Sequence, residues 1–179
     1  MSAADFDVWF ATYLQQSPIQ VERLLHDKTA VRFLIAWSLV ETSCFHGFAK
    51  GKDLAKHCRR ISEEEGFCSS SLMPILKHFH ERYQDKTLYA NLMHGNSNPD
   101  IKPLLSRTVE SLSEAESLYF LVSVVYRYRN NIFHGSKGVA SWLKFKPQIE
   151  HCIQIMQALI THASQLANWE TQFDAAQIA

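Results

Sequence analysis

One segment of the chain gathers cationic, amide and imidazole side chains within ten residues: Tyr126-Arg-Tyr-Arg-Asn-Asn-Ile-Phe-His-Gly135. Five basic residues and no acidic residue lie between Tyr126 and Lys146, although the whole chain balances 18 basic against 18 acidic residues. Aromatic side chains alternate with these cations. Because bases stack on aromatic rings and phosphates pair with cations, this composition is typical of an RNA-binding surface.

Helical geometry distributes these polar groups over different faces. At about 100° per residue, Tyr126, Asn130 and His134 share one face. Arg129 instead continues an apolar ridge that runs through residues 118–125. On a regular helix Arg129 and His134 point about 140° apart. Both groups therefore reach one phosphate only if the helix bends at its end or if two copies of the motif meet across an interface.

The segment Arg129-Asn-Asn-Ile-Phe-His134 resembles the R-x4–6-H motif of the HEPN superfamily, in which Asn commonly follows the Arg. HEPN domains are small helical bundles, commonly homodimeric, and many are metal-independent endoribonucleases of toxin–antitoxin and phage-defence systems. The resemblance covers the motif and the general helical layout. It implies an all-α, single-domain bundle over residues 1–179, a homodimer, RNA as substrate, and an antitoxin or nucleotidyltransferase as a further partner. It implies no metal and no cofactor.

The chemistry that this resemblance implies is attack of the RNA 2′-OH on the adjacent phosphate. His134 would serve as base or acid near neutral pH. Arg129 would hold two phosphoryl oxygens and stabilise the developing charge, and Asn130 would orient the histidine or the 2′-OH. Two motifs across a two-fold axis would supply two histidines, one for each role. Further candidates for substrate contact are Arg127, Tyr128, Asn131 and Lys137.

The same residues also fit a role without catalysis. An Arg at the end of an apolar ridge often extends along it to solvent, and His-Gly is a common helix ending. The chain repeats His-Gly at His46-Gly47 and His94-Gly95, and residues 91–95 echo residues 131–135. The alternative function is therefore a helical interaction module that binds RNA, a nucleotide or a partner protein. A third possibility is a toxin held inactive by its partner.

The elements that must position this segment are helical. Hydrophobic spacing predicts five helices, over residues 5–16, 30–46, 71–83, 113–133 and from about 141 or 147 to 167, in a bundle of roughly five to seven. Pro18 restarts the chain, Asp27 or Thr29 caps the second helix, and Ser113 with Glu116 forms a capping box. The helix over 30–46 is apolar on nearly all sides, which is typical of the centre of a bundle.

The remaining segments are less regular. Residues 51–60 form a short basic helix or loop, which extends the RNA surface or pairs locally with the acidic run 63–65. Residues 84–103, rich in Asn, Gly and Pro, predict a loose loop or insertion with at most one short helix. Residues 170–179 predict a frayed tail.

Composition limits the class of protein. With 46% hydrophobic and 20% charged residues, the chain is an ordinary globular protein and is excluded from the disordered class. The longest apolar stretches reach about half the length that spans a bilayer, and the N-terminus lacks a signal-peptide pattern. Four dispersed cysteines without a CxxC pair are typical of reduced thiols, so we expect a cytoplasmic protein without membrane contact.

Other chemistries lack a motif. The chain has no P-loop, no dinucleotide-binding glycine pattern and no serine-hydrolase elbow. Two cysteine–histidine pairs, Cys44 with His46 and His57 with Cys58, match no common zinc spacing and would form a site only if two helices met there. We expect core thiols and exposed histidines instead.

Overall fold

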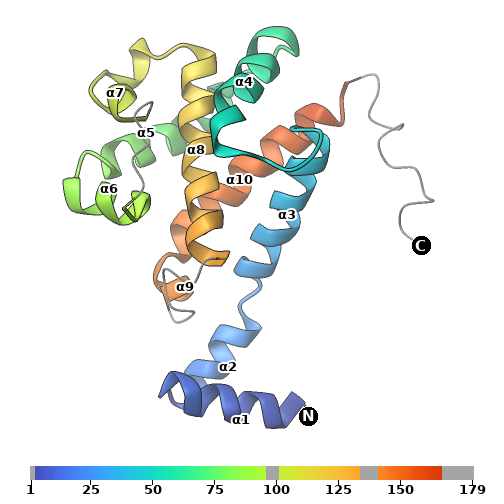
Figure 1. The fold of residues 1–179 in the computed structure, drawn as a ribbon, viewed down its shortest axis with the longest axis vertical. Coiled ribbons are helices and arrows are strands. Elements are labelled where there is room, and N and C mark those ends of the chain that lie inside the picture. The colour runs from blue at the N-terminus through green and yellow to red at the C-terminus, as the bar shows by residue number, and fades with distance from the viewer. Residues whose placement is uncertain (1–2, 96–100, 134–140, 167–179) are drawn as a thin grey trace.

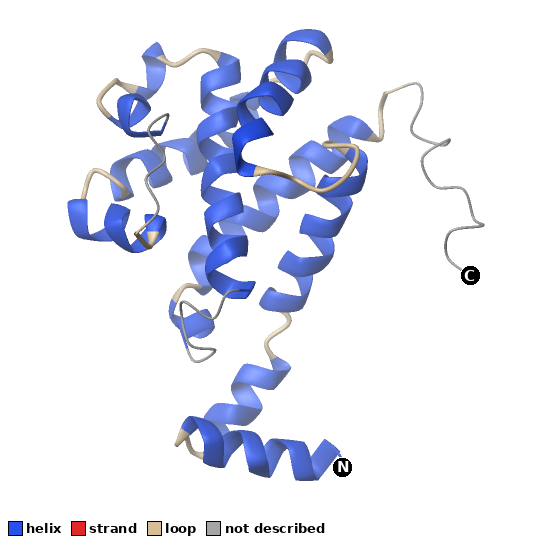
Figure 2. Cartoon of the chain, in the orientation of Figure 1, coloured by secondary structure: helices blue, strands red, loops and turns tan. Residues whose placement is uncertain are grey.

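Three helices that are distant in the sequence form the centre of the fold: α3 (Thr29–Ser43), α8 (Glu114–Phe133) and α10 (Lys146–Ala163). In this computed structural model, which describes residues 3–95, 101–133 and 141–166, α10 packs along α3 and contacts α8 (Figure 1). The regular elements of these ranges are all helical, and none is a strand (Figure 2). The all-α fold class expected from the sequence is therefore confirmed.

Shorter helices surround this centre. α4 contacts one side of α8, α5, α6 and α7 contact another, and α1 and α2 pack on each other and project from one end (Figure 1). Their bounds are α1 (Ala3–Leu14), α2 (Pro18–His26), α4 (Leu54–Arg59), α5 (Met73–Arg82), α6 (Lys86–Met93), α7 (Ile101–Leu105) and α9 (Ser141–Lys144). The described ranges thus hold ten α-helical segments, seven of them with eight residues or more. None of these helices is long and apolar enough to cross a membrane.

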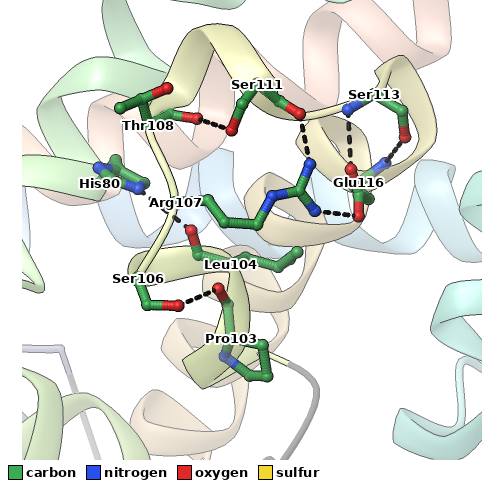
Figure 3. Close-up of polar contacts among 9 residues, drawn as sticks. All are labelled: His80, Pro103, Leu104, Ser106, Arg107, Thr108, Ser111, Ser113 and Glu116. Carbon is green, nitrogen blue, oxygen red and sulfur yellow. Dashed lines mark hydrogen bonds and ion pairs between the residues drawn. The ribbon is translucent and has the colours of Figure 1, made fainter.

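The N-terminus of α8 is fixed by the predicted capping box. The backbone N–H of Ser113 donates to the Glu116 carboxylate at 2.8 Å, and the N–H of Glu116 donates to Ser113 Oγ at 3.2 Å (Figure 3). Arg107 pairs with the same carboxylate at 2.5 Å and donates a hydrogen bond to the carbonyl of Ser111 (Figure 3). Two free N–H groups of the helix end are thereby satisfied, and the negative charge favours the positive end of the helix dipole.

Of the three central helices, α8 is the most completely enclosed. Leu118, Phe120, Leu121 and Val124, which occupy several faces of α8, are completely buried. On α3, by contrast, one face packs on α10 while Val31 and Ile35 are 57% and 58% exposed. The helix expected over residues 30–46 therefore lies in the centre of the bundle, as its composition predicts, but one of its faces is uncovered. An apolar residue on every side does not guarantee a neighbour on every side.

Most predicted helix boundaries are close to the observed ones. Pro18 opens α2 after the Ser17 cap, and the N–H of Thr29 donates to the Asp27 carboxylate at 2.8 Å at the start of α3. The predicted helix at the C-terminus divides into α9 and α10, and Pro147 lies in the first turn of α10. The predicted tail over residues 170–179 lies outside the described residues.

The segment 84–103 is more ordered than its composition predicts. Asp85 caps α6 by accepting hydrogen bonds from the N–H groups of Thr87 and Leu88 at 2.8 and 2.9 Å. α7 already begins at Ile101, with Pro103 in its first turn, where the missing N–H of proline costs nothing. The prediction of a loose loop is thus corrected for residues 86–93 and 101–103, while residues 96–100 lie outside the described part.

Two imidazoles meet where α5 packs near α10. The ring centroids of His78 and His151 are 4.8 Å apart, and the His78 side chain is half-buried. Burial lowers the pKa of His78, and the charges of His151 and Arg82 lower it further, against a smaller opposing effect of Glu81. Burial also lowers the pKa of His46 and of His57.

These lowered pKa values predict a loss of stability in acid. Near pH 6.5 these histidines bind protons in the unfolded chain but not in the folded protein. The free energy of unfolding is therefore highest above about pH 6.5 and decreases as the pH falls below it. His78→Phe is expected to reduce this dependence without removing it, because His46 and His57 still contribute. Urea midpoints measured at about pH 7.5 and about pH 5.5 test this. Equal losses in the variant and in the wild type would contradict the assignment to His78.

Candidate nucleic-acid interface

The residues of the motif surround the C-terminal end of α8 and contact different neighbours. Tyr126 and Arg129 lie against α3 and the segment that follows it. Tyr128 and Asn131 lie against α5 and α6. Side chains that are adjacent in the sequence therefore belong to two different environments, as the rotation of about 100° per residue requires.

Arg129 lies between an amide and an aromatic ring. Its Nη1 donates a hydrogen bond to the side-chain oxygen of Asn130 at 3.1 Å, and its Cζ lies 5.7 Å from the centre of the Phe48 ring. Both polar side chains are half-buried, whereas Phe48 is 66% exposed. A guanidinium beside an open aromatic face combines a phosphate-binding group with a surface on which a base can stack.

The backbone of the segment after α3 holds Phe48 at the surface. Gly47, four residues after the end of α3, adopts φ +135°, a backbone conformation that favours glycine. The Glu41 carboxylate accepts a hydrogen bond from the N–H of Ala49 at 3.0 Å, and Arg60 donates one to the carbonyl of Cys44. Since both ends of the loop are held, Phe48 stays at the surface beside Arg129.

Two basic segments that are far apart in the sequence meet at this site. A Cβ on Gly51 would lie 3.2 Å from the Tyr126 ring, so the backbone at Gly51 packs directly on α8. Lys50 and Lys52, on either side of it, are exposed and make no ion pair within the described ranges. They place further positive charge next to the motif helix.

The arginines at the end of this basic run pair with the acidic residues that follow, which is the second role expected for the run. Arg59 approaches Glu63 at 4.0 Å, and Arg60 pairs with Glu65. These local ion pairs occupy the arginines, so the candidate surface extends over the lysines of the run and not over its arginines.

Two motif residues predicted to contact substrate are part of the packed interior. Tyr128 is 5% exposed and accepts a hydrogen bond from the Tyr83 hydroxyl at 3.2 Å. Asn131 is 6% exposed, and its Nδ2 donates to the carbonyl of Leu92 at 3.1 Å. That carbonyl belongs to the last turn of α6 and has no partner within its own helix. Asn131 therefore joins α8 to α6.

Arg127 lies on the α6 side of the motif helix. Burial raises the pKa of Tyr89, and the nearby charge of Arg127 opposes that rise. The other two predicted site residues, His134 and Lys137, lie outside the described residues. The structure thus brings Arg129 and Asn130 together and places Tyr128, Asn131 and Arg127 toward α5 and α6.

The two other His-Gly pairs end helices. His94 adopts φ +47° as the cap of α6, and His46 adopts φ +55° in the turn after α3. Both conformations are left-handed, and each is followed by a glycine with positive φ. The helix-ending role considered for His-Gly is therefore observed at these two positions.

The cysteines are mainly core residues. Cys44, Cys58 and Cys152 are buried, and burial raises the pKa of each thiol, that of Cys44 to about 12. Cys68 is exposed. In the ranges that the structure describes, no three side chains of the metal-binding types gather into one group.

Phe48 could not be identified from the sequence alone. Its only local signal is its position directly after His46-Gly47, which marks a turn but not a surface aromatic. Its role depends on the approach of Arg129, which is distant in the chain.

The contrast between the two neighbouring asparagines can be tested by mutation. Asn131→Ala leaves the carbonyl of Leu92 buried without a partner, so we expect a loss of about 1–3 kcal/mol in the free energy of unfolding. Asn130→Ala removes a half-buried amide and is expected to cost less than about 1 kcal/mol. Urea denaturation of both variants measures the difference. Equal destabilisation would contradict the separation of Asn130 from the packed interior.

Comparisons with protein-family models, with curated proteins and with solved structures found no significant match to this chain.

Proposed function

We propose that this protein is a metal-independent endoribonuclease of the HEPN type that acts in a toxin–antitoxin or phage-defence context. The observation that carries the proposal is the position of Arg129, which lies beside Asn130 and over the exposed ring of Phe48 at the end of α8. The same site adjoins two exposed lysines. A phosphate group and a stacked base would find complementary groups there.

Each group has a defined part in the cleavage. Arg129 binds phosphoryl oxygens and stabilises the negative charge that grows as the 2′-oxygen attacks. Asn130, hydrogen-bonded to Arg129, fixes the position of that guanidinium or orients the 2′-OH. His134 transfers the proton, as base toward the 2′-OH or as acid toward the 5′-oxygen that leaves. Phe48 holds a neighbouring base by stacking.

A homodimer is the second part of the proposal. Because α8 is helical without interruption from Glu114 to Phe133, two copies of the motif are a more direct way to assemble a site than a bend within the helix. Val31 and Ile35 expose an apolar face near the beginning of α3, which lies at the same end of the bundle as the end of α8 (Figure 1). A second copy covering this face would bring the two motifs near each other.

A groove beside this face provides further apolar surface. It has a volume of about 580 Å³, lies between α3 and α10, and is lined by Ile35, Leu39, Ile153 and Ile160 among others. An antitoxin or nucleotidyltransferase partner and a cytoplasmic location belong to the same proposal.

A non-catalytic interaction module is the alternative, and one observation favours it. Tyr128 and Asn131 connect α8 to its neighbours, so part of the motif contributes to the stability of the fold. In that case Arg129 and Phe48 would bind RNA, a nucleotide or a partner protein without cleaving a bond.

Cleavage of RNA in the presence of EDTA distinguishes the two functions. We expect the purified protein to cut mixed RNA with the chelator present and to leave 2′,3′-cyclic phosphate ends. Arg129→Ala and His134→Ala are each expected to lower the rate at least about a hundredfold, the usual contribution of a charge-stabilising or proton-transferring group. Arg59→Ala, which removes one exposed arginine distant from the motif in sequence, should retain the wild-type rate.

Two results would contradict the nuclease. Cleavage that requires a divalent metal would exclude the proposed chemistry. RNA that stays intact with the wild-type protein, but binds to it and not to Arg129→Ala, would establish the interaction module instead.

The dimer is tested by light scattering on a sizing column. The wild type is expected at twice the chain mass of 20.6 kDa. Ile35→Glu, which places a charge in the apolar face of α3, should yield monomers that retain their helical circular dichroism. Gln154→Glu is the control, a charge placed at an exposed position of α10 that does not line the groove, and it should leave the dimer intact. A wild-type protein that is monomeric yet fully active would refute the two-copy site.

A further inference from the structure

A second cavity, lined by polar side chains and by Leu88, Leu92 and Phe145, lies beside the motif helix. It has a volume of about 150 Å³ and forms where the ends of four helices converge. α5 contributes Arg82 and its C-cap contributes Tyr83. Asn91 comes from α6, Tyr128 from α8 and Lys144 from α9. The proposed cleavage chemistry uses none of these groups except Tyr128, for which the sequence predicts substrate contact.

The cavity is positively charged. Its walls include the guanidinium of Arg82 and the ammonium of Lys144 and no carboxylate. Neither cation forms an ion pair within the described ranges. Glu81, directly before Arg82, is exposed and does not line the cavity, and the carboxylate of Asp85 caps α6. Two cations on one small cavity without a counter-charge favour an anionic ligand.

The hydroxyl of Tyr128 has a proton left to donate. Its oxygen accepts a hydrogen bond from Tyr83 at 3.2 Å, and Arg82 lies within hydrogen-bonding reach of the same oxygen. A phenol carries one proton, and no acceptor for it is found in the described part of the chain. Because burial raises the pKa of Tyr128 to about 12, the group stays protonated at neutral pH. An oxygen atom in the cavity would complete its hydrogen bonding.

Part of the hydrogen-bonding capacity of the Arg82 guanidinium is unused within the described ranges. Its side chain is half-buried, and its Nε is buried without a hydrogen-bond partner in the described ranges. A guanidinium at such a site has further N–H groups that match two oxygens of one tetrahedral anion. Lys144 and Asn91 are exposed at the rim and supply additional donors.

The volume decides what size of ligand fits. Pockets that enclose whole drug-sized ligands measure about 300–1,000 Å³. The cavity of 150 Å³ is smaller than these and suits a single tetrahedral group, with the remainder of the ligand outside. Its donors are two cations and a phenol, a set that pairs with the oxygens of an anion such as phosphate.

We propose that this cavity is a phosphate-binding site for a nucleotide, either one within an RNA strand or a free mononucleotide. As a site for an RNA strand, it rests on the proposed function, since it would anchor the strand beside the motif without taking part in cleavage. As a site for a mononucleotide it stands independently. Arg82 and Lys144 bind the phosphate charge, and Tyr128 donates one oriented hydrogen bond.

Binding measurements by calorimetry test the site without depending on cleavage. The probes are AMP, adenosine without phosphate, and a short single-stranded RNA whose 2′-oxygens are methylated so that it cannot be cleaved. Arg82→Gln is expected to weaken binding of AMP, of the RNA or of both by at least about tenfold, and adenosine should not bind measurably. Lys144→Gln, at an exposed position where the fold is not at risk, should weaken the same ligand. Arg82→Lys keeps the charge and should restore part of the affinity.

The results with the two ligands distinguish a mononucleotide site from a site for an RNA strand. An effect confined to AMP assigns the site to a mononucleotide, and an effect confined to the RNA assigns it to the strand. Arg59→Gln is the matched control, with one cation removed from a different surface, and should bind both ligands as the wild type does. If neither ligand binds the wild type, or if Arg82→Gln and Lys144→Gln bind as tightly as the wild type, the site does not exist.

Failure of this proposal is distinct from failure of the nuclease. If Arg129→Ala abolishes cleavage while Arg82→Gln changes neither affinity nor cleavage, the cavity is not a phosphate site and the nuclease stands. If Arg82→Gln weakens AMP binding and no RNA is ever cut, the cavity binds phosphate and the nuclease is wrong. When both hold, Arg82→Gln should raise KM and leave kcat nearly unchanged.

Discussion

The burial of α8 is the constraint on which the rest of the structure depends. A helix of 20 residues with apolar side chains on several faces must be covered on all of them, and α4, α5, α6, α7 and α10 provide most of that cover. From α3, Trp37 adds its ring against Tyr126. Its N-terminus is fixed by a capping box, so the helix enters the core at a defined point. Glu114 and Glu116 in its first turn are engaged by Ser69 and by the capping box, whereas its arginines and asparagines lie in the last turns. Chemistry in this helix therefore belongs at its C-terminal end.

That end of α8 serves two purposes at once. Arg129 and Asn130 lie beside an exposed aromatic ring, whereas Tyr128 and Asn131 form buried hydrogen bonds to α5 and α6. The alternation follows from the helical repeat, which turns each successive side chain by about 100°. Buried hydrogen bonds on one face hold the helix end still, and the opposite face can then present its cation in a fixed position. Stability and binding are in this way divided between neighbouring residues.

Local signals predicted much of the fold, while contacts distant in the chain determined the site. Pro18, Pro74 and the pair Ser113–Glu116 mark helix starts through the chemistry of the backbone alone, and the helices begin there. The segment 84–103 was expected to be loose because its Asn, Gly and Pro residues suggest turns, yet Asp85 caps a helix within it. Phe48, Arg82 and Lys144 carry no local mark of function. They matter because the packing of α8 brings them to its end, and no spacing along the chain records that packing.

The central claim is that nucleic acid binds where Arg129 meets Phe48. The most direct measurement is ultraviolet crosslinking of an uncleavable RNA containing 4-thiouridine, followed by mass spectrometry of the crosslinked peptides. We expect crosslinks in the peptide that contains Phe48 and in the peptide that contains the end of α8. Both crosslinks should be lost in Arg129→Ala. Crosslinks confined to the α1–α2 pair, or crosslinks that persist unchanged in Arg129→Ala, would contradict it.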